Sequence, residues 1–189
     1  IQSWSAVVRR RARASMFESE GMCLSLSRSC TIDGMDISTT QTYNASPSAV
    51  AQALLSSELA AKRAKLARVD DYTHTVDGSK ATTVVNVPAE RLPSKARTFA
   101  RNGAKVTITT VASGDSVKYT VDPHGLPAEV SAALKLSGDA TTTADLSANL
   151  KVKIPLLGGK IEKRAAGMVD RLLAKDAKLV EEVIEEQGS

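Results

Sequence analysis

The spacing of apolar residues changes at one point near the C-terminus, and this change restricts the fold more than any other feature of the chain. Up to residue 154 apolar residues recur at every second position, and from residue 161 they recur at every third or fourth. A period of two is that of a strand with one buried face, and a period near 3.6 is that of an amphipathic helix. We therefore expect a sheet that ends in one long helix, a shape that encloses a cavity when the sheet is curved.

The strand pattern covers two adjacent segments with a turn between them. Apolar residues occupy the even positions of both segments: Val130, Ala132, Leu134 and Leu136, then Ala144, Leu146, Ala148, Leu150, Val152 and Ile154. Ser137, Gly138 and Asp139 supply turn residues between the segments. The pattern predicts an antiparallel hairpin with one face buried.

The helical pattern predicts a helix over residues 159–186. At 1.5 Å per residue this helix is about 40 Å long, enough to cross a sheet. Its apolar stripe consists of Ile161, Ala165, Met168, Leu172, Leu179 and Val183. Gly158 and Gly159, just before it, are interpreted as a sharp turn that brings helix and strand close together.

The earlier part of the chain predicts a strand, two short helices and further strands. Ser46 is a suitable N-cap with Pro47 at the first helical position, and the two helices are expected at 47–55 and 57–67, with Ser57 capping the second. Later glycine turns separate further strand patterns. The predicted fold class is α+β: a curved antiparallel sheet of about seven strands wrapped on a long C-terminal helix, with two short helices after the first strand.

Two stretches resemble the START-like superfamily, also called the SRPBCC or helix-grip fold. MDISTTQTYNASPSAVAQAL, at residues 35–54, is similar to its first strand and following helix, and VKIPLLGGKIEKRAAGMVDRLL, at residues 152–173, is similar to its last strand and closing helix. The resemblance covers 35–189 and suggests an uncharacterised actinobacterial family. It implies the fold described above but no single function, since the superfamily includes lipid carriers, hormone receptors, polyketide cyclases and ring-opening enzymes.

Residues 1–34 show no clear period and are predicted to be a disordered N-terminal extension before a START-like domain at 35–189. Whether this extension belongs to the native protein is left open. Both cysteines, Cys23 and Cys30, lie in this segment, with a spacing that matches no zinc motif. A core without cysteine needs no oxidising compartment.

Composition argues against two kinds of partner, nucleic acid and the membrane interior. The net charge of +4, from 25 basic and 21 acidic residues, gives little support for a nucleic-acid partner. No stretch approaches the ~18 apolar residues of a membrane-spanning helix. We therefore predict no stable membrane insertion. Residues 1–34 carry no credible targeting signal, so a cytoplasmic location is predicted, and the oligomeric state is left open.

No residue set predicts a reaction. The two histidines, His74 and His124, have no neighbouring ligand for a metal and are interpreted as surface residues. Glu162 suits the first turn of a helix, although in an enzyme it would be a candidate acid or base. No catalytic residue, metal or cofactor is predicted.

The leading hypothesis is non-enzymatic binding or transport of a small hydrophobic or lipid-like ligand in an internal cavity. Such a cavity is expected to exceed roughly 300 Å³. The residues expected to line it are Tyr119, Leu134, Leu146, Leu150, Ile161, Ala165, Met168 and Leu172. The alternatives are a cyclase- or hydrolase-like enzyme with a sparse acid–base set, favoured by a polar pair that includes His74 or Glu162, and a protein-interaction module, favoured by a filled core and a large exposed apolar patch.

Overall fold

The computed structural model describes residues 35–92, 94, 96–152 and 158–188; over 158–170 it gives the course of the helix and not the side chains. Seven strands form one antiparallel sheet in the order β1-β7-β6-β5-β4-β3-β2. The strands are β1 (Met35–Tyr43), β2 (Tyr72–Asp77), β3 (Lys80–Val87), β4 (Ala104–Ser113), β5 (Ser116–His124), β6 (Ala128–Gly138) and β7 (Thr142–Val152).

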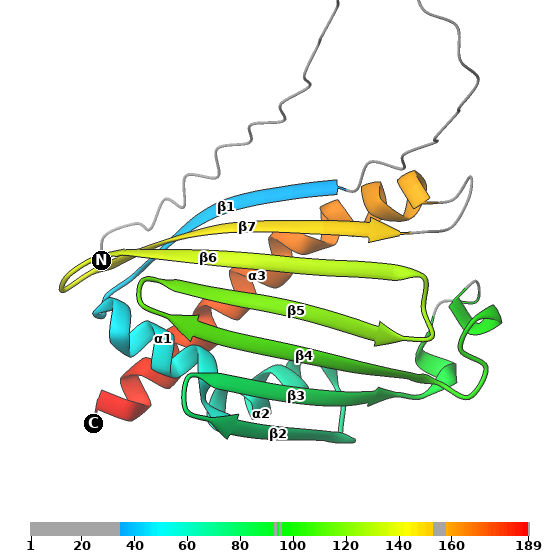
Figure 1. Cartoon of the computed structure of the whole chain (residues 1–189), viewed down its shortest axis with the longest axis horizontal. Helices are drawn as coiled ribbons and strands as arrows, with labels where there is room; N and C mark the ends of the chain where they lie inside the picture. The colour runs from blue at the N-terminus through cyan, green and yellow to red at the C-terminus, as the bar shows by residue number, and fades with distance from the viewer. Residues whose placement is uncertain (1–34, 93, 95, 153–157, 189) are drawn as a thin grey trace, which may run out of the picture.

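Three α-helices lie on one face of this sheet (Figure 1). They are α1 (Pro47–Leu55), α2 (Ser57–Ala67) and α3 (Gly158–Gly188), and two short 3₁₀ helices, η1 (Ala89–Arg91) and η2 (Ala96–Thr98), follow β3. α3 crosses behind the sheet from the β1–β7 side to α1 (Figure 1). The predicted fold class is therefore confirmed, and we call the helix-covered side of the sheet its inner face.

The predicted hairpin is β6 and β7, and its register follows the alternation in the sequence. Leu134 lies opposite Leu146, and Val130 lies opposite Leu150. Gly138 ends β6 with a φ of 116°, where an added Cβ would collide with the Thr141 carbonyl oxygen. Only glycine fits this turn without strain.

The first short helix begins at the predicted cap, and the second does not. The Ser46 hydroxyl accepts a hydrogen bond from the Ala49 amide at 3.3 Å, with Pro47 at the start of α1, as predicted. For α2, the cap predicted at Ser57 is wrong. Ser56 has the extended backbone of a cap, and its hydroxyl accepts from the Leu59 amide at 3.2 Å.

One part of the inner face is fully packed. Val117, Leu134, Leu136 and Ala144, which we call the packed cluster, are 0%, 8%, 1% and 0% exposed. They contact α1 and the C-terminal half of α3, where Val180 and Val183 are also fully buried. This cluster forms the main hydrophobic core.

A second part of the inner face is less covered. Ile108, Val121, Val130 and Leu150 are register neighbours on β4, β5, β6 and β7, and all four are only half-buried. We call them the half-buried row. Beyond β4 the row continues to Thr83 and His74.

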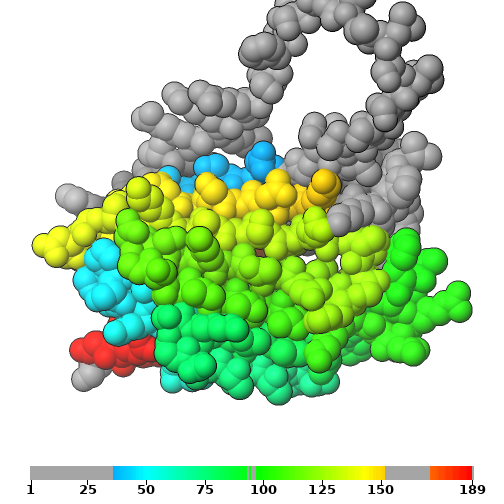
Figure 2. All heavy atoms as spheres, in the orientation of Figure 1, coloured from blue at the N-terminus to red at the C-terminus, as the bar shows by residue number. Residues whose placement is uncertain are grey.

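None of the described helices covers the outer face of the sheet, which Figure 2 shows. Its central register neighbours are small and polar: Thr75, Thr82, Thr109, Thr120 and Ser131. A sheet with one apolar and one polar face follows directly from the alternation in its strands.

Candidate functional site

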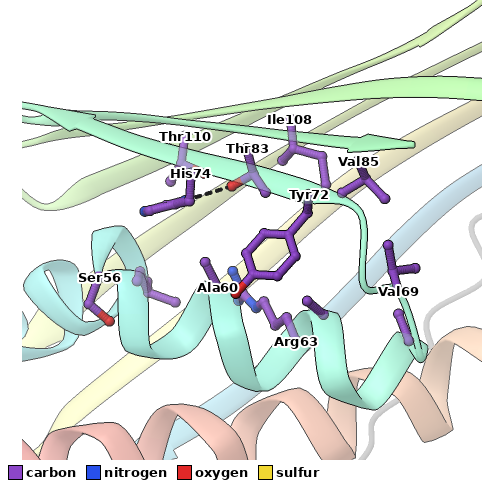
Figure 3. A pocket seen from close by; sticks show the side chains of 13 residues that line it. Ser56, Ala60, Arg63, Val69, Tyr72, His74, Thr83, Val85, Ile108 and Thr110 are labelled. Atoms are coloured by element: carbon purple, nitrogen blue, oxygen red, sulfur yellow. Dashed lines mark hydrogen bonds between the residues drawn. The ribbon is translucent and has the colours of Figure 1, made fainter. Parts of the chain in front are cut away.

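A pocket of about 170 Å³ lies between α2 and the inner faces of β2, β3 and β4 (Figure 3). We call it the α2 pocket. Its walls are mainly apolar, with a smaller set of polar side chains. The lining residues are Leu54, Ser56, Ala60, Arg63, Ala64, Ala67, Val69, Tyr72, His74, Thr83, Val85, Ile108 and Thr110.

Strand alternation explains which polar residues enter this pocket. Tyr72 and His74 are two apart on β2, so both side chains point inward. Figure 3 shows the Tyr72 ring extending from the strand toward Arg63 on α2. Ile108, also in the wall, connects the α2 pocket to the half-buried row.

His74 is held by hydrogen bonds through both ring nitrogens. Nε2 lies 3.1 Å from the Leu55 carbonyl oxygen, and Nδ1 lies 2.8 Å from the Thr83 hydroxyl. A carbonyl only accepts, so Nε2–H is the donor, and Thr83 donates to Nδ1 when the imidazole is neutral. Neither nitrogen is left to act as a base or to bind a metal.

Arg63 is paired with Asp176 of α3. Its Nε and Nη2 donate to the two carboxylate oxygens, both at 2.7 Å, in a bidentate arrangement. Burial opposes the charge on Arg63, but the hydrogen bonds and attraction to Asp176 outweigh it and raise the pKa of the guanidinium. The positive charge that borders the pocket is therefore already neutralised.

Two tyrosines lie next to this ion pair on the inner face. Burial is the main cause that raises the pKa of both Tyr43 and Tyr119, and Asp176 adds to it. The Tyr43 hydroxyl donates to Gln41 Oε1 at 3.0 Å, and the Gln41 amide donates to the Leu173 carbonyl oxygen at 3.2 Å. This network fastens β1 to α3.

α2 is also joined to α3 at its exposed side. Lys62 Nζ lies 3.1 Å from a Glu182 oxygen and 2.9 Å from a Glu186 oxygen. These contacts raise the pKa of Lys62. The acidic end of α3 thus faces Lys62 of α2.

The residues predicted to line a cavity fall into four groups. Leu134 belongs to the packed cluster, and Tyr119 and Leu146 pack against it. Leu150 belongs to the half-buried row, while Leu172 is 52% exposed. The side chains of Ile161, Ala165 and Met168 lie outside the described residues, and none of the predicted residues lines the α2 pocket.

Sequence reasoning placed His74 wrongly. It was expected at the surface, but it is half-buried and lines the pocket. His124 is at the surface as predicted, 47% exposed on its side chain and 3.5 Å from Asp122. The signal that was missed is that His74 shares a strand face with Tyr72.

The described residues contain no cluster of His, Cys, Asp and Glu suited to a metal ion. In that same part of the chain, no helix combines the length and apolarity needed to cross a membrane.

Comparison with known structures supports the fold. TTHA0849 from Thermus thermophilus is 12% identical, with a TM-score of 0.57 over 82% of this chain and 100% of that one. A point mutant of Thalictrum flavum norcoclaurine synthase, solved with a transition-state analogue, is 15% identical, with a TM-score of 0.55 over 82% and 97%. Ara h 8.0201 is 14% identical, with a TM-score of 0.53 over 81% and 99%.

These identities are low, so the likeness concerns the fold alone. No curated protein matches the chain by sequence. One family model does match, over residues 38–184, and its members are described as proteins of unknown function. The chain therefore belongs to the DUF2505 family, and its fold is the START-like helix-grip fold.

Proposed function

We propose that the protein binds a small hydrophobic molecule, without chemical conversion, between the sheet and its helices. The observation that carries this proposal is the half-buried row. Its four apolar side chains point toward the helices but keep accessible surface, whereas the packed cluster on the same face is closed. Apolar surface of this kind favours an apolar ligand, because burying it removes it from water.

The α2 pocket supports the proposal at the end of this row. It combines an apolar wall with a few polar groups, which is the usual composition of a small-molecule site. In the proposed complex the ligand lies along the half-buried row. The predicted residues Ile161, Ala165 and Met168 cover it from α3.

The size of the α2 pocket limits what it holds. Its volume of about 170 Å³ is below the ~300 Å³ expected for a drug-sized ligand. It is close to the ~150 Å³ of a cavity that accommodates benzene. The pocket alone therefore suits one ring or a short branched group, which is smaller than the lipid-like ligand expected from the sequence.

The enzyme hypothesis has no comparable support. Both nitrogens of His74 are already bonded, and Arg63 is paired with Asp176. An interaction module would be favoured by a large exposed apolar patch. The described large apolar residues above a third exposed come from separate segments of the chain: Leu66, Val76, Phe99, Val111 and Leu172.

Native mass spectrometry of the full chain, purified without denaturant, tests the proposal. A discrete added mass that organic solvent extracts, and that is absent after unfolding, is the expected result. A sample with the bare polypeptide mass that also fails to bind any single-ring probe would overturn it. Actinobacterial origin and a cytoplasmic location remain predictions.

A further inference from the structure

Thr110 is the only polar side chain in the α2 pocket wall that is both nearly buried and without a described hydrogen-bond partner. The residue is 5% exposed and lines the pocket from β4. No hydrogen bond joins its hydroxyl to any described residue. No fully enclosed polar side-chain atom among the described residues lacks a partner, so this hydroxyl keeps access to the pocket.

Water that enters the pocket can hydrogen-bond to this hydroxyl, and a ligand that fills the pocket displaces that water. A purely apolar ligand leaves the hydroxyl buried without a partner, which costs more than an ordinary hydrogen bond gains. A ligand of the same size that brings a hydrogen-bonding atom to Thr110 avoids this cost.

The charges around the pocket point to an uncharged ligand. Arg63 is the fixed positive charge in its wall, and its side chain already forms two 2.7 Å hydrogen bonds with Asp176. An anionic ligand would have to displace Asp176 or lie beside it. The two carboxylates would repel each other, and solvent weakens this repulsion without removing it, because the Asp176 side chain is 31% exposed.

We propose that the α2 pocket selects uncharged single-ring molecules that carry one hydrogen-bonding group, such as a hydroxyl or a carbonyl, and that Thr110 recognises that group. This inference rests on the proposed function and adds the chemical class of the ligand. The pocket volume limits the ligand to one ring, and the Thr110 hydroxyl bonds the polar group of that ligand. The Arg63–Asp176 pair excludes ligands with a carboxylate.

Three single-ring probes test this proposal, titrated against the full chain by ligand-observed NMR: phenol and toluene, which match in size, and benzoate, which carries the larger, charged carboxylate. Phenol is expected to bind and benzoate to bind at least about tenfold more weakly. Thr110→Val removes the hydroxyl at nearly constant volume. This substitution is expected to lower the affinity for phenol about tenfold, the effect of one buried hydrogen bond. It is expected to change the affinity for toluene by less than about threefold.

Two variants act as controls. Thr109→Val makes the same substitution on the outer face of the same strand and is expected to leave all three affinities unchanged. Asp176→Asn removes the charge that pairs with Arg63 and is expected to raise benzoate affinity about tenfold.

The outcomes separate the two proposals. The proposed ligand class is wrong if toluene binds and Thr110→Val changes the affinities for phenol and toluene equally. It is also wrong if benzoate binds the unmodified protein as tightly as phenol does. In both cases the proposed binding function stands. If none of the probes binds, this proposal fails for the α2 pocket. In that case the extracted mass still decides whether the protein carries a ligand elsewhere.

Discussion

Two parts of the same sheet face differ in how completely they are covered. The packed cluster and the half-buried row share strands β5, β6 and β7 and follow the same alternation. Even so, Val117 is fully buried while Val121, four residues later on β5, is only half-buried. The difference arises from the helices, since α1 and the C-terminal half of α3 close over the first region. Alternation therefore shows which face a residue occupies but not whether that face is filled.

The largest expected effect comes from making the same change, valine to alanine, once in each region. Val117→Ala should lower the free energy of unfolding by about 2–3 kcal/mol, because it removes two buried methyl groups and leaves a cavity. Val121→Ala should cost less than about 1 kcal/mol, since its side chain already has accessible surface. Urea unfolding of both variants measures this, and equal losses would mean that the two regions are packed alike.

The second effect concerns how α2 is held over the pocket. Asp176→Asn should lower the free energy of unfolding by about 1–2 kcal/mol, because Arg63 loses its bidentate partner. This is less than the ~3–5 kcal/mol typical of a fully buried pair, since the two side chains are 33% and 31% exposed and solvent screens them.

The matched control for this pair is Lys62→Met. It removes ion pairs between the same two helices whose acidic partners, Glu182 and Glu186, are more than half exposed, so its effect on thermal unfolding should be smaller. A larger loss for Lys62→Met than for Asp176→Asn would show that the exposed contacts, and not Arg63, hold α2 in place.

The third effect is a loss of stability in alkali. Burial raises the pKa of Tyr43 and of Tyr119, so the unfolded chain releases these protons first as the pH rises. Their stabilising contribution is complete below about pH 10 and falls above it, by at most about 1.4 kcal/mol per pH unit for each tyrosine. Urea unfolding between about pH 8 and 11 measures this, and Tyr43→Phe should make the decline less steep. An unchanged slope would mean that Tyr43 is not a source of the alkaline loss.

The smallest effect tests the start of α2. Ser56→Ala should cost about 1 kcal/mol, because the Leu59 amide loses its cap. Ser57→Ala should change stability by less than about 0.5 kcal/mol. Thermal unfolding of the two variants compares them, and the reverse order would restore Ser57 as the cap.

Local patterns predicted most of the fold. The alternation around Leu134 and Leu146 indicated the hairpin and its register, and Ser46 with Pro47 indicated the start of α1. Each of these signals lies within a few residues of the structure it specifies. The START-like resemblance then supplied the arrangement of the elements.

The candidate pocket was not predicted, because it depends on contacts between distant segments. Arg63 and Asp176 are 113 residues apart, and no local pattern connects them. His74 was assigned to the surface because it stands between threonines, although its position two residues from Tyr72 places both on one strand face. Thr110 lies on β4, against which α1 packs, and this contact between distant segments is specified by no single segment of the sequence.

Methyl NMR of the full chain during a phenol titration tests most directly whether the ligand occupies the less covered part of the inner face. The methyl resonances of Ile108 and Val121 are predicted to shift in proportion to bound phenol, while those of Val117 and Leu136 stay within experimental error. Shifts concentrated at Val117 and Leu136, or no shift at Ile108 at saturating phenol, would contradict binding at the half-buried row.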